Sequence, residues 1–364
     1  MKSLGIYIHV PFCGRKCAYC DFYSLPYRKD TAGGYVQAVL RNIRHYSDRG
    51  YITDTVYFGG GTPSLLTAEE VSLILREIKE NFLFADDAEI TLEANPNTLS
   101  PDRLSGFFSA GINRLSVGVQ SMNDSELHFL GRTHSAKRAE KAVLDAYAAG
   151  FRNISCDLMT ALPGQTAESL RYSIERFAEL PVTHISSYLL KVEEGTPFDC
   201  DDVKALLPDD DEAASLYLDT VRLLGEKGFM QYEISNFSHP GYESRHNCRY
   251  WKCLDYIGIG PSAHSCYKGK RFAVPRDAAA FVGSDVQPVT VTDESPCGFE
   301  EFAMLRLRLT EGLDLDLFPE QKSRIAKKIP ALEKAGYILY DGKNLSLTPE
   351  GMLVSNAVIS SIIF

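Results

Sequence analysis

The chain has 364 residues, of which 45% are hydrophobic and 24% are charged, which supports a large core with a smaller second domain and excludes an intrinsically disordered chain. The net charge of −10 argues against a nucleic-acid partner, and no apolar run is long enough to span a membrane. Nine cysteines without a secretory leader indicate a reducing compartment, so we expect a cytoplasmic protein.

The N-terminal region combines a strand with a cysteine-rich loop. Residues Leu4 to Val10 alternate and are rich in β-branched and aromatic side chains, which predicts a strand, and Pro11 ends it. The loop that follows carries Cys13, Cys17 and Cys20 at a C-x3-C-x2-C spacing. The three thiols therefore lie just past the carboxyl end of a first strand, which is the edge of an α/β sheet where ligands bind.

Three thiolates on one short loop can converge on a single metal centre. A 4Fe–4S cluster usually has four cysteine ligands, so three ligands leave one iron free for the amino and carboxylate groups of S-adenosylmethionine. An electron from such a cluster would then release a 5′-deoxyadenosyl radical.

Other chemistries of this loop are less favoured. A zinc site of three cysteines with His9 or another histidine is the main alternative, but no second C-x2-C or H-x3-H pair follows. A disulfide is disfavoured by the odd number of cysteines and the length of the chain. The other six cysteines are scattered, and we interpret them mostly as ordinary core or surface thiols.

Strand and helix signals alternate through the first half of the chain. After the first strand, further strands are predicted at 55–58, 89–93, 114–119, 153–158 and 184–190. Helices are predicted between them at 31–48, 67–82, from 100 onward, 135–149 and 166–180. Six βα units in sequence predict an α/β fold with a parallel sheet that curls into a barrel or part of one.

The pattern loosens after about residue 199 and changes again near residue 299. Residues 285–298 contain two prolines and a glycine and are predicted to be a linker. Beyond them, two helices, a hairpin turned by Asp341-Gly342 and a final helix predict a small α+β, winged-helix-like domain. We therefore divide the chain into a core barrel at 1–230, an extension with a linker at 231–297 and a C-terminal domain at 298–364.

Glycine and polar residues follow several of the predicted strands. Gly59-Gly60-Gly61-Thr62-Pro63 comes directly after the second strand, and consecutive glycines let backbone groups approach a ligand. Glu93 ends the third strand, and an acidic side chain at this place can bind the hydroxyl groups of a ribose. The alternative roles of Glu93 are to cap a helix or to form a surface ion pair. Gln120 follows the fourth strand, Asp157 lies in the fifth, and Arg132 lies between them. Because the ends of parallel strands meet at one edge, we expect these residues to face the cysteine loop.

The cysteine spacing is the signature of the radical SAM superfamily. The stretches from Tyr7 to Cys13 and from Cys17 to Phe22 resemble the branch that contains HemN, the oxygen-independent coproporphyrinogen III dehydrogenase, and HemW, the haem chaperone. The resemblance implies a partial (β/α)6 radical SAM barrel with a 4Fe–4S cluster on Cys13, Cys17 and Cys20. It also implies that S-adenosylmethionine and the cluster are contacted by Tyr7, Tyr19, Gly60, Gly61, Thr62, Glu93, Gln120, Arg132 and Asp157. One departure, Ala161 where the branch usually has glycine, concerns only local geometry.

Three features separate the two members of this branch. The dehydrogenase has a further cysteine two residues after the third, where this chain has Phe22, and a sizeable extension before the first strand, which this chain lacks. The segment His246-Asn247-Cys248-Arg249-Tyr250-Trp251 matches the H-N-x-x-Y-W motif of HemW. The residues by themselves favour a packed turn in the core, although imidazole is a good haem-iron ligand and aromatic rings suit a porphyrin. The resemblance favours His246 as a haem ligand, with Cys248 as an alternative.

The chain is therefore identified as a member of the HemW family. The resemblance implies a cytoplasmic radical SAM-type haem chaperone that uses a 4Fe–4S cluster, S-adenosylmethionine and haem, and that delivers haem to haemoproteins such as respiratory enzymes. The resemblance also implies an electron donor as a partner, is compatible with a homodimer and gives no nucleic-acid partner. The alternative is an enzyme, an oxygen-independent coproporphyrinogen III dehydrogenase that acts by radical oxidative decarboxylation. A third interpretation is radical SAM modification of RNA or protein. No residue is assigned a catalytic role, and enzyme status stays open.

Overall fold

The computed structural model describes all 364 residues and contains one curved sheet of 12 strands. The six strands predicted for the barrel are all present, and each pairs in parallel with the next. Their bounds are β1 Lys2–Val10, β4 Tyr51–Gly60, β5 Leu83–Ala94, β6 Arg114–Gln120, β7 Asn153–Thr160 and β8 His184–Leu189. The prediction of a parallel α/β sheet is confirmed.

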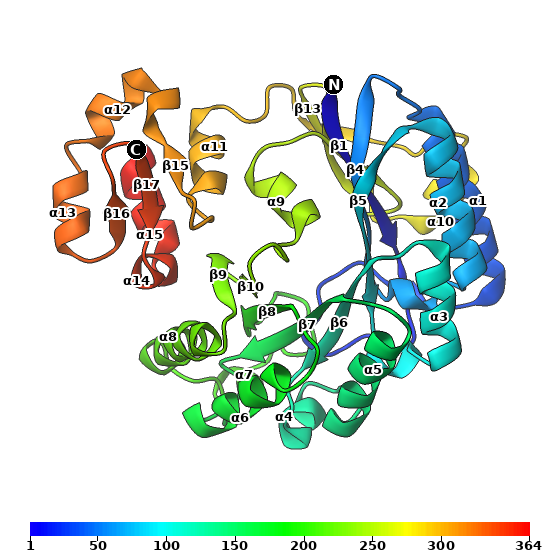
Figure 1. Cartoon of the computed structure of the whole chain (residues 1–364), viewed down its shortest axis with the longest axis horizontal. Coiled ribbons are helices and arrows are strands. Elements are labelled where there is room, and N and C mark those ends of the chain that lie inside the picture. Colours follow the sequence, from blue (N-terminus) through cyan, green and yellow to red (C-terminus); the bar gives the residue numbers. More distant parts are fainter.

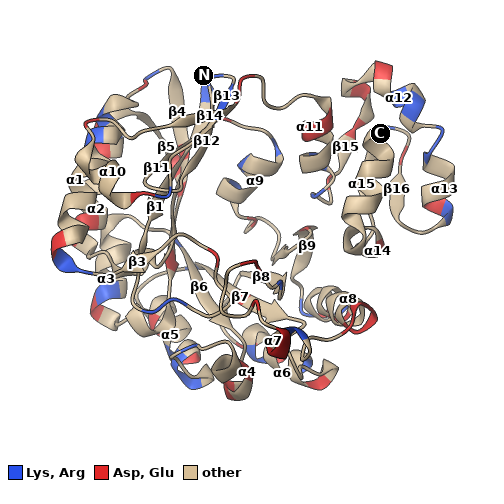
Figure 2. Cartoon of the chain, turned by 180° about the vertical axis from the view of Figure 1, so that it is seen from behind, with Lys and Arg blue, Asp and Glu red and all other residues tan.

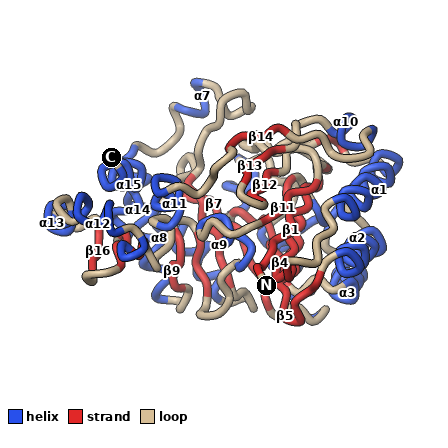
Figure 3. The backbone as a smooth tube through the Cα atoms, turned by 90° about the horizontal axis from the view of Figure 1, so that it is seen from above, coloured by secondary structure: helices blue, strands red, loops and turns tan.

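Helices cover the outer face of this sheet (Figure 1). They are α1 Lys29–His45, α2 Ala68–Asn81, α3 Pro101–Ala110, α4 Asp124–Phe129, α5 Ala136–Ala148 and α6 Ala167–Ala178. Local chemistry sets where they begin, since Thr67 and Glu70 form a capping box on α2 and Ser100 caps α3. The apolar sides of the helices and the strands form one continuous core, and Figure 3 shows α1, α2 and α3 outside the strands from above.

The sheet continues past the six barrel strands at both edges, and these added strands were not predicted from the sequence. Beside β1 lies the parallel strand β11, followed by antiparallel β12, β13 and β14, and beside β8 lie antiparallel β10 and β9. Their bounds are β9 Met230–Glu233, β10 Asn236–Ser238, β11 Tyr256–Ile259, β12 His264–Tyr267, β13 Lys270–Ala273 and β14 Thr290–Asp293. Because β14 and β9 end the sheet and do not pair with each other, the barrel is open.

Part of the segment predicted as a linker, 285–298, forms β14. Strands this short give too few alternating positions to be recognised against a loop. One further long helix, α8, spans Asp210–Glu226. The short elements of this part are β2 Phe12–Cys13, β3 Leu25–Pro26, α7 Asp201–Lys204 and α10 Ala278–Gly283, and the 3-10 turns at Pro63–Leu65, Pro96–Thr98 and Leu315–Leu317.

The helix α9, Arg245–Trp251, carries the H-N-x-x-Y-W motif and lies on the inner side of the curved sheet (Figure 1). The carboxylate of Glu89 on β5 accepts hydrogen bonds from the backbone N–H groups of Arg245 and His246, each at 3.0 Å. A negative charge at a helix N-terminus is favourable because the unpaired N–H groups there are partly positive. Near its other end, the buried Arg249 forms an ion pair with Asp54 on β4. The two contacts fix α9 across the open barrel.

A small C-terminal domain with its own hydrophobic core follows β14 (Figure 1). It consists of α11 Phe299–Arg306, α12 Pro319–Ile325, α13 Ile329–Lys334, α14 Pro349–Leu353 and α15 Ser355–Ile363 around a three-stranded sheet of β15 Leu313–Asp314, β17 Asn344–Leu347 and β16 Ile338–Tyr340. The β16–β17 hairpin turns at Asp341-Gly342 as predicted. Helices with a small antiparallel sheet agree with the predicted winged-helix-like domain.

Charged residues of both signs are interspersed along the outer helices (Figure 2). None of the helices combines the length and the apolar composition that crossing a membrane requires.

The placement of β11 can be tested through Gly258. A Cβ atom at this position would lie 2.2 Å from the backbone oxygen of His264, so Gly258→Ala should force the strands apart and lower the free energy of unfolding by about 2 kcal/mol or more. Gly283→Ala is the control, because nothing lies within 4 Å of its Cβ position. Urea denaturation measures both variants, and equal stability would contradict the close approach of β11 to the His264 backbone.

Candidate cofactor site

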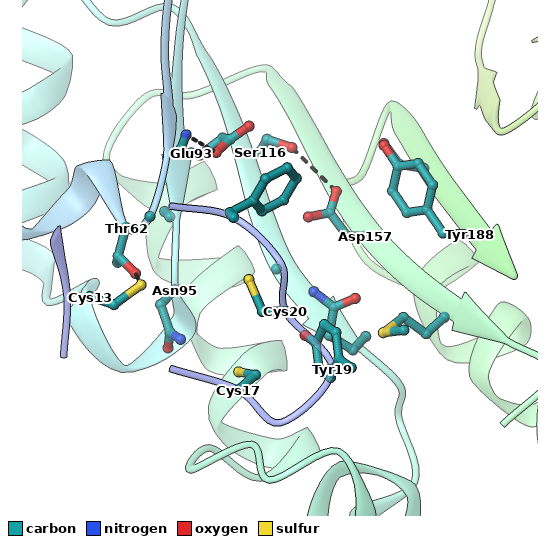
Figure 4. A pocket seen from close by; sticks show the side chains of 18 of the residues that line it. Cys13, Cys17, Tyr19, Cys20, Thr62, Glu93, Asn95, Ser116, Asp157 and Tyr188 are labelled. Atoms are coloured by element: carbon teal, nitrogen blue, oxygen red, sulfur yellow. Dashed lines mark hydrogen bonds between the residues drawn. The ribbon is translucent and has the colours of Figure 1, made fainter. Parts of the chain in front are cut away.

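The carboxyl ends of the barrel strands surround one cavity of about 560 Å³ (Figure 4). Its lining includes most of the residues predicted from the sequence, namely Cys13, Cys17, Tyr19, Cys20, Gly60, Gly61, Thr62, Glu93, Gln120, Arg132 and Asp157. Residues from six separate segments meet here because parallel strands share one carboxyl edge.

Backbone hydrogen bonds hold the cysteine loop against the end of β4. The N–H of Gly61 donates to the carbonyl of Val10 at 2.8 Å, and the N–H of Thr62 donates to the carbonyl of Phe12 at 2.7 Å. A Cβ atom on Gly61 would lie 2.5 Å from the Phe12 carbonyl oxygen, so only glycine fits at this position. Thr62 Oγ1 in turn lies 3.3 Å from the sulfur of Cys13, which places the first thiol at the cavity wall.

The three thiols are all partly exposed toward the cavity. Arg132 Nη1 donates to the sulfur of Cys17 at 3.4 Å and lies 3.5 Å from Tyr19 Oη, while Nη2 donates to the carbonyl of Gly118 at 2.5 Å. The thiolate is the form in which a cysteine ligates a metal. The structure does not close the sulfurs around a common centre. A donor set of three cysteines on one loop is nevertheless the soft set that suits an iron–sulfur cluster.

The backbone at the end of β6 is distorted where it meets the cavity. Gln120 has a φ of +78°, which is uncommon for a residue other than glycine, and the β6–β7 register shifts between Val117 and Gln120. Bulges of this kind re-aim side chains next to functional sites. The distortion turns the Gln120 amide into the cavity lining.

Among the carboxylates that line the cavity, Glu93 and Asp157 lie on barrel strands. Glu93 accepts hydrogen bonds from the Tyr57 hydroxyl at 2.8 Å and the Gly60 N–H at 3.1 Å, and burial raises its pKa to about 7. Asp157 accepts a hydrogen bond from Ser116 Oγ at 3.4 Å, and burial raises its pKa to about 6 (Figure 4). Carboxyl groups that titrate near neutral pH in a cavity are common at binding sites. Both groups can accept hydrogen bonds from the hydroxyl or ammonium groups of a ligand.

Several residues of the cavity lining were not predicted from the sequence, including Asn95, Arg114, Ser116, Tyr188 and Asn247. Two of them had a signal in the sequence, since Asn95 comes two residues after Glu93 and Asn247 is part of the motif on α9. Arg114 is only 1% exposed at the start of β6 and reaches the cavity from within the barrel. The position of Arg114 at the start of a predicted strand does not indicate that its side chain reaches the cavity.

Tyr7 and His246, both predicted from the family resemblance, are absent from the cavity lining. The imidazole of His246 is fully buried, with Nδ1 2.8 Å from Thr55 Oγ1 and Nε2 2.9 Å from Tyr250 Oη. Burial lowers the pKa of His246 well below its ordinary value. The ring of Tyr7 stacks near that of His246, with centroids 6.3 Å apart. These side chains form an aromatic layer behind the cavity.

The helix α9 separates the cofactor cavity from a second cavity of about 600 Å³. Asn247 lines the first cavity, whereas Arg245, Cys248 and Arg249 line the second. Neighbouring residues of α9 therefore line different cavities, and α9 borders the cofactor cavity through Asn247.

Comparisons with known proteins agree with this geometry. The family model of the Radical SAM superfamily matches residues 7–177, and that of the HemN C-terminal domain matches residues 299–354. The chain is 34% identical to "Heme chaperone HemW" of Haemophilus influenzae, over 99% of this chain and 97% of that protein. The chain belongs to the HemW family. It is also 39% identical to the HemW of Escherichia coli, over 72% of this chain and 70% of that protein.

Among solved structures, the coproporphyrinogen III oxidase HemN of Escherichia coli superposes with a TM-score of 0.82. The alignment covers 100% of this chain and 90% of that chain at 23% identity, so the likeness shows a shared fold. The predictions of the HemW family and of an open radical SAM barrel with a small C-terminal domain are therefore confirmed.

The raised pKa of Glu93 predicts a pH-dependent stability. The folded protein binds the Glu93 proton more tightly than the unfolded chain does, so the contribution of this group to stability falls as the pH rises from about 4.5 to about 7. Glu93→Gln removes the buried charge, and without cofactors the variant should exceed the wild type at pH 8 by on the order of 1–2 kcal/mol.

Urea denaturation of the cofactor-free protein at pH 8 and at pH 4.5 checks this effect. The advantage of Glu93→Gln should vanish at the lower pH, where the carboxyl group of the wild type is protonated as well. A wild type that is more stable than the variant at pH 8 would contradict the raised pKa.

Proposed function

We propose that this protein is a cytoplasmic haem chaperone that holds a 4Fe–4S cluster and S-adenosylmethionine in the cavity at the strand ends. One observation carries the proposal: three thiols from one loop and the polar groups of four strand ends line the same cavity, in a chain whose relatives are named haem chaperones. The nine cysteines are all free, which fits a reducing compartment.

Cys13, Cys17 and Cys20 would bind the cluster, which leaves one iron for the amino and carboxylate groups of S-adenosylmethionine. When bound, the cluster supplies a single electron that can cleave the sulfonium bond. The remaining residues position the ligand. Gly60, Gly61 and Thr62 would offer backbone groups to its amino acid part, and Glu93, Gln120, Arg132 and Asp157 would contact its ribose and carboxylate. Tyr19 lies within reach of Arg132 and would stabilise that contact.

Haem would bind near the cavity mouth and the motif helix. Phe22, which stands where a dehydrogenase has a further cysteine, is 67% exposed at the cavity, and Tyr188 and Leu189 are 43% and 40% exposed there. Such exposed apolar groups suit the flat faces of a porphyrin. For His246 to bind haem iron, its Nε2 must exchange the Tyr250 hydroxyl for the metal, and the helix α9 must open from its buried position. The haem acceptors would be haemoproteins such as respiratory enzymes, an electron donor would reduce the cluster, and the chaperone could act as a homodimer.

The cluster assignment is tested by anaerobic reconstitution with iron and sulfide. The wild type should acquire about four irons and the broad visible absorption of a 4Fe–4S cluster. Cys17→Ala should lose most of both, whereas Cys200→Ala, at an exposed cysteine outside the cavity, should match the wild type. Retention of the full iron content in Cys17→Ala would contradict the assignment.

The haem assignment is tested by hemin titration under anaerobic conditions. His246→Ala should bind haem at least about tenfold more weakly than the wild type, since it lacks the proposed axial ligand. Tyr250→Phe should bind more tightly, because Nε2 no longer has a hydrogen bond to give up. His45→Ala, at an exposed histidine on α1, is the control.

A parallel assay with coproporphyrinogen III separates the chaperone from the dehydrogenase. We expect haem binding without conversion of coproporphyrinogen III. A wild type that converts coproporphyrinogen III and fails to bind haem would overturn the proposed function in favour of the enzyme.

A further inference from the structure

The inner part of the cofactor cavity contains a buried cation without a salt-bridge partner. Arg114 on β6 is 1% exposed and is the largest of the fully buried side chains. Its Nε atom is buried and has no hydrogen-bond partner. Because burial of a charged group is unfavourable unless other groups pair with it, an arginine in this state is expected where a ligand supplies the partner.

Comparison with the other arginines shows that Arg114 differs from them. In five further arginines the Nε atom is likewise buried and unpartnered, but each of them binds a carbonyl or carboxylate oxygen through an Nη atom. They are Arg41, Arg103, Arg132, Arg271 and Arg308. Arg249, the other buried arginine, is paired with Asp54. Arg114 makes no such contact, although it lines the cavity.

Arg114 lies deeper in the cavity than Arg132 does. Arg114, Ser116 and Gly118 all line the cavity because alternate residues of a strand face the same side. The carbonyl of Gly118 accepts the hydrogen bond from Arg132, and four residues of a strand separate Gly118 from Arg114 by about 13 Å. Thr91, which pairs with Arg114 from β5, also has a buried Oγ1 without a partner. Two neighbouring strands therefore each carry an unpartnered polar group at the inner end of the cavity.

The other cations of the cavity lining are exposed or already paired. Arg15 and Lys16 are exposed on the cysteine loop, and Lys191 forms an ion pair with Glu193 at 2.9 Å. Arg132 contacts Cys17 and Gly118 as described above. An anionic group that enters the cavity past the strand ends therefore meets Arg114 as a buried and unpaired cation.

Hydrogen-bond donors for an anion lie on the same wall as Arg114. Glu93 and Ser116 are register neighbours on β5 and β6, and Ser116 contacts Asp157 (Figure 4). Burial raises the pKa of Glu93 to about 7 and that of Asp157 to about 6. Near neutral pH a share of each carboxyl group is therefore uncharged and donates a hydrogen bond. One fixed positive charge beside hydroxyl and carboxyl donors suits a carboxylate ligand.

We propose that Arg114 is the inner carboxylate site of the cofactor cavity and that it binds one propionate group of haem. The inference rests on the proposed function, in which haem and S-adenosylmethionine are the two ligands that carry carboxylates. The carboxylate of S-adenosylmethionine is assigned to the free iron and Arg132, near the opposite end of β6. Haem carries two propionates on one edge of an apolar ring, and one of them would reach inward to Arg114 when the ring lies against Tyr188 and Leu189. The planar guanidinium matches a carboxylate with two parallel hydrogen bonds.

This pairing would make haem binding depend on the charge of the propionates. A propionate that leaves water loses its hydration, and Arg114 compensates for this loss while it gains the partner that it lacks. Hemin dimethyl ester has the same ring and the same iron, but its esterified propionates carry no charge. Arg114 would therefore favour hemin over the ester.

The test compares hemin with hemin dimethyl ester in anaerobic titrations of the reconstituted protein, followed by Soret absorbance. The wild type should bind hemin at least about tenfold more tightly than the ester, as expected of a hydrogen-bonded charge pair. Arg114→Gln should bind hemin about tenfold more weakly and lose the preference, whereas Arg114→Lys should keep part of it. Arg222→Gln, at an ion-paired arginine of α8 outside the cavity, is the control and should match the wild type. Circular dichroism confirms that each variant is folded.

Equal affinity of the wild type for hemin and for the ester would overturn the inference and leave the haem chaperone intact, and this comparison needs no variant. A preference that persists in Arg114→Gln would overturn it as well, because another residue would then bind the propionate. If Arg114→Gln keeps its hemin affinity but loses the paramagnetic resonance response of the cluster to S-adenosylmethionine, the carboxylate belongs to S-adenosylmethionine instead. A wild type that binds neither hemin nor the ester would overturn the proposed function together with the inference.

Discussion

The whole cofactor site depends on the parallel pairing of β1 with β4. The register places Tyr7 opposite Tyr57 and Val10 opposite Gly60, and the hydrogen bonds of Gly61 and Thr62 continue the pairing past the strand ends. The cysteine loop is therefore set directly against the glycine loop. Each further parallel strand needs a crossover connection, so every βα unit brings the chain back to the carboxyl edge of the sheet. Polar residues from successive units therefore lie together at this edge.

The site holds two carboxyl groups in positions that burial desolvates, and this lowers the free energy of unfolding when the groups are ionised. Glu93 and Asp157 have pKa values raised by burial, and the buried Arg114 lowers both in part. Carboxyl groups whose pKa lies near neutral pH can accept hydrogen bonds from ligand hydroxyl groups, and they disfavour the folded state when they are ionised. The rest of the barrel offsets this cost through its continuous apolar core and through α9, whose N-terminus is held by Glu89.

The strands and most cavity residues could be predicted because they follow local rules. Alternating apolar runs locate the barrel strands, and Gly60 and Glu93 lie at strand ends, where a parallel sheet brings side chains together. Residues whose role depends on tertiary packing could not be found this way. Arg114 enters the cavity from the start of its strand, and His246 is buried behind the cavity that the motif suggested it would serve. The added strands β11 to β14 could not be predicted either, because four residues each are too few to leave an alternating pattern.

The central claim is that three thiols and the strand-end residues form one site with a free iron for S-adenosylmethionine. Electron paramagnetic resonance of the reduced, reconstituted protein tests it most directly, with spectra taken before and after S-adenosylmethionine is added. The account predicts that the g values of the cluster change on addition in the wild type. It also predicts a markedly smaller change in Arg132→Ala, which would remove the proposed contact with the carboxylate of S-adenosylmethionine. A cluster spectrum that S-adenosylmethionine leaves unchanged in the wild type would contradict it.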